Sequence, residues 1–259
     1  MFAFNCFVLF CAVFTLCDSA FVDTLKKCHY DDGSCLKGVV QGVLESIAEP
    51  GIPEYGIPPL DPLKVNNLKL NIMDLAEITI IEGVLKGLKH CKINEVKLEM
   101  EKGHGFLEVL CDVSAKGKYD IAGSSPALKD LFGGGVLKGN GNAKIKIEKL
   151  KININLIFDV VKGSDGDVYI QCKKGKGEFD FDLQGSSHLT LDNLFIGDVE
   201  SSKTISDYYN EHHKTLWKSF GKKVFASIND IIYEWLHKFF GKVPSKYYLD
   251  GDLTPYVKN

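Results

Sequence analysis

Residues 203–240 read KTISDYYNEHHKTLWKSFGKKVFASINDIIYEWLHKFF. Apolar side chains recur here every three or four residues, the spacing that gathers them on one face of an α-helix. At ~1.5 Å per residue this helix would be about 57 Å long. We expect any bend at Gly221, and Phe240-Gly241 followed by Pro244 predicts the end of the helix. So long a helix requires an elongated body to cover its apolar positions, which are Ile205, Tyr208, Tyr209, His212, Leu216, Phe220, Val224, Ile228, Ile232, Trp235, Leu236 and Phe239.

The preceding part of the chain, from about residue 64 to 198, alternates apolar and polar residues. This period of two is typical of antiparallel strands with one apolar and one polar face. The phase slips at Glu148-Lys149, which predicts a β-bulge, and bulges let a sheet curl. We therefore expect fold class α+β, with the long C-terminal helix wrapped lengthwise by a strongly curved antiparallel sheet. Turns are predicted at four glycine-containing sites: 103–105, 133–135, 139–141 and 164–167.

Near the amino end, residues 28–45 read CHYDDGSCLKGVVQGVLE, a tight cysteine pair joined to a second amphipathic helix. Ser34 is predicted to cap this helix and Pro50-Gly51 to end it. Five of the eight prolines then lie between residues 50 and 62, which predicts an extended, stiff crossing. The apolar face of the helix consists of Leu36, Val39, Val40, Val43, Leu44 and Ile47.

The first seventeen residues carry no charged side chain, and small residues, Ser19 and Ala20, follow the apolar run. This pattern is typical of a secretory signal peptide. The alternative is a membrane anchor, but the run is short for a span of ~20 residues. We therefore expect residues 1–19 to be a signal peptide, residues 20–259 to form a single secreted, extracellular domain, and the protein not to insert stably into a membrane.

Removal of this leader takes Cys6, Cys11 and Cys17 away and leaves five of the eight cysteines. Cys28 and Cys35 bracket a turn-rich hexapeptide, and we predict a disulfide between them in an oxidising compartment. The remaining three sit in phase with apolar neighbours, as buried free thiols do. We interpret them as core thiols, with a second disulfide among them as the alternative; they are Cys91, Cys111 and Cys172.

The net charge is −3, and the loss of Asp18 with the leader would make it −2. A nearly neutral chain gives no reason to expect nucleic acid or an anionic membrane as a partner. All 31 basic residues other than histidine are lysines. Because bidentate recognition of phosphate, carboxylate or guanine normally uses arginine, its absence weakens the case for an enzyme or a nucleic-acid-binding protein. The lysines of residues 144–151 alternate with apolar residues, which predicts the solvated face of a strand rather than a polyanion site.

Motifs for catalysis are missing from the sequence. The seven histidines form no metal-binding spacing and no Gly-x-Ser-x-Gly occurs. Gly139-Asn140-Gly141 lacks the further glycine and the strand-to-helix setting of a dinucleotide loop, so we interpret it as a turn. We predict a protein that is not an enzyme and has no cofactor or metal.

What remains is apolar surface on the two helices. Part of it packs in the core, and we predict that another part lines an internal tunnel between helix and sheet, where a hydrophobic small-molecule ligand is held with few polar contacts. The helix at 34–47 would close one end. Two other functions are kept open: a secreted signalling or interaction protein acting through a cell-surface receptor without a transported ligand, and an esterase. The candidate lining residues are Val39, Val43, Ile47, Trp217, Phe220, Val224, Phe225 and Ile228.

Four features together resemble the insect takeout and juvenile-hormone-binding-protein family: the Cys28/Cys35 pair, IPPLDPL at 57–63, GKYDIAG at 117–123 and YNEH at 209–212. The resemblance covers essentially the whole mature chain. It implies a tubular lipid-binding fold, secretion, no catalysis, and a tunnel for a terpenoid, fatty-acid or quinone-like ligand. Roles of such relatives include hormone transport, feeding, chemosensation and circadian physiology.

Two departures from the family pattern place the chain nearer to the takeout branch. Hormone carriers have a second disulfide, but no cysteine follows Cys172 here, so that bridge cannot form. His212-His213 also stands where the family often has Asn-Trp. The resemblance therefore does not favour juvenile hormone over other apolar ligands.

Overall fold

The computed structural model of the chain describes residues 21–72, 76–124, 135–175 and 177–258, except for the side chains of residues 71, 72, 220, 223, 224 and 227. The predicted leader lies outside these residues, as do residues 133 and 134 of one predicted turn. The helices are α1 (Gly33–Ile47) and α3 (Ser202–Phe240). Short 3-10 turns are η1 (Phe21–Thr24), η2 (Pro53–Tyr55), η3 (Leu88–His90), η4 (Met100–Lys102), η5 (Ser245–Tyr247) and η6 (Thr254–Tyr256).

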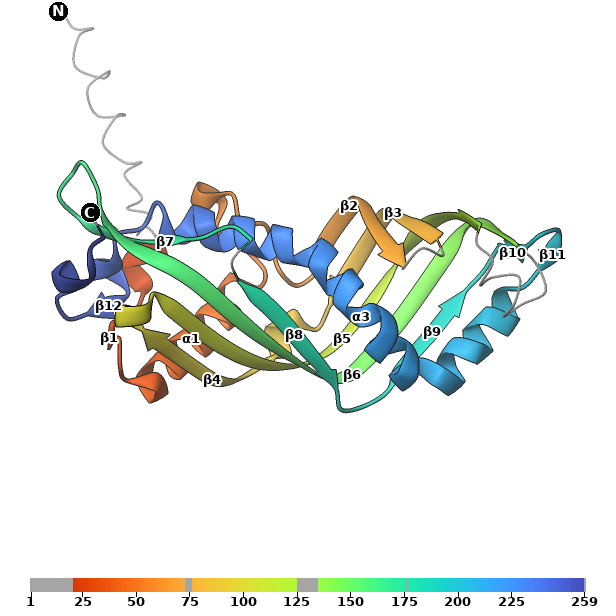
Figure 1. The fold of residues 1–259 in the computed structure, drawn as a ribbon, viewed down its shortest axis with the longest axis horizontal. Helices are drawn as coiled ribbons and strands as arrows, with labels where there is room; N and C mark the ends of the chain where they lie inside the picture. Colours follow the sequence, from red (N-terminus) through yellow and green to blue (C-terminus); the bar gives the residue numbers. More distant parts are fainter. Residues whose placement is uncertain (1–20, 73–75, 125–134, 176, 259) are drawn as a thin grey trace, which may run out of the picture.

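The described residues form a ten-stranded antiparallel sheet in the order β11-β10-β6-β5-β3-β2, with β4 pairing with β5, and with β7, β8 and β9 pairing with β6. Figure 1 shows α3 running lengthwise across an elongated molecule, with β2 and β3 above it and β8 below it in this view. This confirms the predicted α+β class. The strands are β2 (Leu63–Ile72), β3 (Ala76–Lys86), β4 (Lys92–Glu99), β5 (His104–Ser124), β6 (Val136–Lys162), β7 (Val168–Cys172), β8 (Glu178–Leu183), β9 (Ser187–Leu191), β10 (Leu194–Ile196) and β11 (Val199–Glu200), and a separate pair is β1 (Cys28–His29) with β12 (Leu249–Asp250).

The sheet curls through bulges, one of which was expected. Cys111 of β5 faces Leu150 of β6, but Val113 faces Ile147, so β6 has one extra residue at the predicted site. Lys149 there has a φ of 50°, and its N–H donates to Asp112 Oδ1 at 2.6 Å. Further register shifts lie between residues 80 and 82 of β3 and between residues 93 and 95 of β4. Because each bulge bends its strand, together they turn the sheet around α3.

Turn predictions succeeded where glycine adopts a positive φ. Gly103 (φ 61°) ends η4 before β5, and Gly166 (φ 87°) lies between β6 and β7. The turn predicted at 139–141 was wrong, because these residues lie within β6. A Cβ on Gly139 would lie 2.7 Å from the carbonyl oxygen of Asn193, and one on Gly141 would lie 2.2 Å from that of Asp192. These glycines do not reverse the chain; they allow the backbone between β9 and β10 to approach β6 closely.

Both disulfides lie at the α1 end of the molecule. Cys28–Cys35 confirms the prediction. The interpretation of Cys91 and Cys111 as free core thiols was wrong, because they form a second disulfide with a Cα–Cα distance of 4.3 Å. The β4–β5 register pairs Lys92 with Leu110 and so sets these cysteines opposite each other, which a single sequence does not reveal. Cys172 is a buried free cysteine, as expected.

Three sets of hydrogen bonds fasten α1. At its start, the Cys35 N–H donates to Asp32 Oδ1 at 2.9 Å, so Asp32 rather than the predicted Ser34 caps the helix. In its middle, Gln41 accepts from the Ile93 N–H at 2.8 Å and donates to the Cys91 carbonyl at 3.1 Å.

The third set lies at the end of α1, where the proline-rich crossing begins. The N–H groups of Leu60 and Asp61 both donate to the Ala48 carbonyl, at 2.8 and 2.7 Å. The buried Asp61 carboxylate in turn accepts from the N–H groups of Gly87 and Lys89, at 2.9 and 3.0 Å. The proline segment therefore connects α1 to the turn before β4.

The YNEH segment fastens α3 to the sheet. The Asn210 amide accepts from the Leu189 N–H at 2.7 Å and donates to the Leu189 carbonyl at 3.0 Å, so that it occupies both groups of one β9 peptide position. Next to it, the Tyr209 hydroxyl bonds Ser187 Oγ at 2.6 Å and accepts from Trp217 Nε1 at 2.8 Å. These contacts fix the rotation of α3 about its axis relative to the sheet.

We predict that Asn210→Ala lowers the free energy of unfolding by about 2 kcal/mol, because two part-buried backbone groups lose their partners. Urea unfolding followed by circular dichroism measures this change. Asn66→Ala is the matched control on an exposed position of β2 and should change stability little. Equal stabilities of the two variants would contradict the role given to Asn210.

Candidate ligand-binding cavity

A cavity of about 1690 Å³ lies between α1, α3 and the inner face of the sheet. Its lining is predominantly apolar and comes from both helices and most strands. One row of paired residues across the inner face of the sheet has very small residues at its centre. These are Gly83 of β3, Gly117 of β5 and Ala143 of β6, which pair in register. Val65 and Leu191 flank this row on β2 and β9. The cavity therefore has room where the sheet passes opposite α3.

The predicted site residues fall in two groups. Six of the eight line this cavity: Val39, Val43 and Ile47 on α1, and Trp217, Phe225 and Ile228 on α3. The side chains of Phe220 and Val224 are outside the described part of the structure. That any of the eight contacts a bound ligand remains a prediction.

Sequence reasoning missed the wall that the sheet contributes. Ile145, Ile147, Leu150, Ile152 and Ile154 of β6 all line the cavity. Their alternation on either side of the bulge was visible in the sequence. It predicts an apolar face of the sheet, but nothing in the alternation distinguishes side chains that pack against one another from those that face a hollow.

An aromatic cluster lies beside the cavity near the middle of α3. Phe181 of β8 stacks on Phe225 with ring centroids 4.7 Å apart, and it meets Trp217 edge-on at 5.5 Å. The Phe181 ring fits here because Gly221 has no side chain; a Cβ at this position would lie 2.0 Å from Phe181 Cζ. The glycine expected to bend the helix therefore permits the close approach of β8, and α3 is helical on both sides of it.

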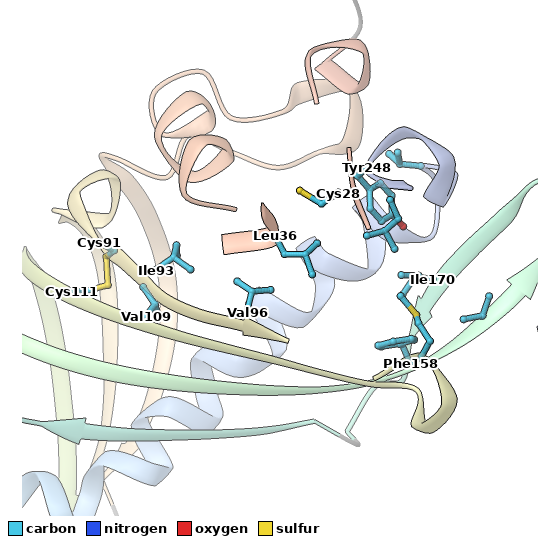
Figure 2. Close-up of a cluster of buried hydrophobic side chains, with 14 of the residues drawn as sticks. Cys28, Leu36, Cys91, Ile93, Val96, Val109, Cys111, Phe158, Ile170 and Tyr248 are labelled. Atoms are coloured by element: carbon cyan, nitrogen blue, oxygen red, sulfur yellow. A yellow bond between two sulfur atoms is a disulfide. The ribbon is translucent and has the colours of Figure 1, made fainter. Parts of the chain in front are cut away.

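The α1 end of the cavity adjoins a continuous buried cluster. Figure 2 shows Leu36 and Val96 at the centre of this cluster, the Cys91–Cys111 disulfide at one edge of it, and Tyr248 and Ile170 at the other. Apart from the disulfide, the residues named here are aliphatic or aromatic. This end of the cavity therefore offers a ligand mainly dispersion contacts.

Burial holds three titratable side chains at the cavity neutral. Burial raises the pKa of the Cys172 thiol to about 11, so the thiol is protonated and a poor nucleophile at neutral pH. Burial likewise raises the pKa of the Tyr248 hydroxyl far above its ordinary value. Burial raises the pKa of Tyr119 to about 12, and this hydroxyl donates to the Asp192 carbonyl at 2.6 Å. Lysines border the cavity at Lys64, Lys69 and Lys116, and among the described lining residues there is no carboxylate.

Two other features are missing from the described residues. No three His, Cys, Asp or Glu side chains among them lie close enough together to hold a metal ion. None of their helices has the length and apolar character needed to cross a membrane.

A long helix against a curled antiparallel sheet is a fold shared with a solved structure. The crystal structure of Epiphyas postvittana Takeout 1 matches this structure with a TM-score of 0.74 and 26% sequence identity, over 87% of this chain and 99% of that chain. The family model described as "Haemolymph juvenile hormone binding protein (JHBP)" matches residues 6–250. The chain belongs to this family.

Other comparisons add little. A crystal structure of lipopolysaccharide binding protein matches with a TM-score of 0.32 and 14% identity, over 76% of this chain and 39% of that chain. This likeness is too low to support an argument. No curated protein sequence matches the chain.

We predict that the mature protein has one reactive thiol, and only after denaturation. Cys172 is buried and its pKa is raised to about 11 by that burial, so a maleimide at neutral pH should label the folded protein slowly. In denaturant without reductant, mass spectrometry should find one label, on Cys172, and four cysteines still paired. Labelling of Cys91 or Cys111 would contradict the second disulfide.

Proposed function

We propose that residues 20–259, after removal of residues 1–19, form a secreted carrier that binds an elongated hydrophobic small molecule in the cavity. The observation that carries this proposal is the cavity of about 1690 Å³ with its apolar lining. Small-molecule sites usually measure roughly 300–1,000 Å³, so this one has room for a chain longer than a drug-sized ligand. A terpenoid, a fatty acid or a juvenile-hormone-like ester all have the required shape.

The physics of burial supports useful affinity without specific polar contacts. Transferring about 16 methylene groups from water at ~0.8 kcal/mol each gives roughly 13 kcal/mol. Association consumes about 5 kcal/mol at the low end of the estimates. The difference of about 8 kcal/mol corresponds to a dissociation constant near 1 μM. The apolar lining adds the condition that the part of the ligand inside the cavity is uncharged, because an unpaired buried charge is costly.

The two other functions considered from the sequence have less support. A signalling protein with a filled interior would have no void above ~300 Å³, and the cavity here is larger. An esterase would need an activated nucleophile, whereas the Cys172 thiol at the cavity has its pKa raised by burial. Secretion is supported by the two disulfides, which form in oxidising compartments.

We predict that delipidated protein takes up a fluorescent long-chain fatty acid or terpenoid saturably, and that Ala143→Phe weakens this binding. The new ring would lie over Gly117 in the cavity and displace about two methylene groups of ligand, which at ~0.8 kcal/mol each is roughly a tenfold loss of affinity. Titration of the probe, with direct displacement by unlabelled ligands, measures the effect.

Ala226→Phe is the matched control, because it adds the same ring at an exposed position of α3. It should leave binding unchanged. Failure of the delipidated wild-type protein to take up any apolar probe would overturn the carrier function. Equal weakening by both variants would show that the probe does not occupy the cavity.

A further inference from the structure

The outer face of the sheet brings together lysines that are far apart in the sequence. Lys64 of β2 pairs in register with Val84 of β3, Val84 with Lys116 of β5, and Lys116 with Lys144 of β6. These positions therefore share one face, with strands ~4.8 Å apart. Lys86 lies two residues beyond Val84 on the same face, at the diagonal distance of ~7–8 Å from Lys64. We call Lys64, Lys86, Lys116 and Lys144 the lysine face; all four are exposed.

The charges of the lysine face are not neutralised by their neighbours. In the described part of the chain, Glu82 is taken by Lys118, with an N–O distance of 2.7 Å, and Glu148 by Lys146. The four lysines themselves take part in none of the ion pairs found there. Lys116 and Lys144 are directly opposed across two antiparallel strands, an arrangement of like charges that destabilises a sheet. Folding gains nothing from this arrangement, so a partner that supplies negative charge would account for it.

One exposed apolar side chain lies on β3, three residues before Val84. Ile81 is 37% exposed and sits at the β3 bulge, where the register with β5 shifts between Ile80 and Glu82. Ile81 does not line the cavity, whereas Lys64 and Lys116 border it. The strands that carry the lysine face on their outer side therefore form the sheet wall of the cavity on their inner side, and Ile81 is exposed on one of them.

The chemistry of this face selects among anionic partners. Lysine offers point charges without the planar fork that reads a single phosphate or carboxylate bidentately, and the chain contains no arginine. Single-stranded nucleic acid is bound on aromatic stacking platforms. The other outer-face positions in these rows include no Phe, Tyr or Trp; they are Val84, Thr190, Ser114, Lys146 and His188. Diffuse positive charge with an exposed aliphatic residue fits the fluid surface of an anionic bilayer.

We propose that the lysine face docks this protein peripherally on anionic phospholipid membranes. Contact would be electrostatic and reversible, without insertion of a helix or strand. It would bring the cavity wall formed by β2, β3 and β5 to the surface in which apolar molecules partition. The net charge of the chain does not reveal the lysine face, because acidic residues elsewhere balance the lysines: the chain has 31 lysines and 34 aspartates and glutamates.

The test is sedimentation of the full mature protein with vesicles of phosphatidylcholine alone or with about one third phosphatidylserine. Binding should require phosphatidylserine and should be lost in about 1 M NaCl, where the Debye length is ~3 Å. The double variant Lys86→Gln/Lys144→Gln, at two positions of the lysine face that do not border the cavity, should bind about 25-fold more weakly, since each lysine contributes roughly fivefold. It removes one charge of the opposed Lys116 and Lys144 pair, so its thermal midpoint should not fall.

The matched control is Lys218→Gln/Lys222→Gln, which makes the same change in net charge at exposed positions of α3. This control should bind vesicles as the wild type does. Equal binding to neutral vesicles, no binding to anionic vesicles, or equal losses in both double variants would each overturn the proposal. Uptake of a fluorescent fatty acid in vesicle-free buffer should be unchanged in both variants, so the outcome is separable from that of the carrier function.

Discussion

The apolar face of α3 is the constraint on which the rest of the structure depends. A helix of 39 residues exposes a long apolar stripe, and burial of that stripe is the dominant favourable term available to the chain. A flat sheet would cover only part of it. The bulges at Lys149, Ile81 and Asn94 bend three strands, and the resulting curl places β2 and β9 on opposite sides of the helix. The polar contacts of Asn210 and Tyr209 then fix which face turns inward.

The same curl explains why the interior is hollow. Side chains from a curled sheet and from one helix cannot fill the space between them where the inner row is Gly83, Gly117 and Ala143. Larger side chains at the two glycines would collide with the neighbouring strands: a Cβ on Gly117 would lie 2.3 Å from the Glu82 carbonyl oxygen. Close strand approach and internal volume thus have a common origin in the missing side chains.

Periodicity was sufficient to predict what depends on local sequence. The helix expected at 203–240 is Ser202–Phe240, the bulge at Glu148-Lys149 is present, and the Cys28–Cys35 bridge forms. Features that depend on strand register were not predictable in this way. The Cys91–Cys111 bridge, the role of Gly139 and Gly141 in a close crossing, and the alignment of Lys64 with Lys116 and Lys144 all require knowing which strands are neighbours. The candidate lining residues named from the sequence were accordingly all on the helices, and their contact with a ligand stays a prediction.

The central claim is that α3 faces a hollow that accepts an apolar molecule, and the chain contains its own reporters of that hollow. Its two tryptophans, Trp217 and Trp235, both border the cavity. Titration of the delipidated protein with a brominated long-chain fatty acid, a contact quencher, is therefore the most direct measurement. The account predicts saturable loss of most tryptophan fluorescence, with no loss for the unbrominated acid. Fluorescence that is unchanged at saturating brominated acid would contradict it.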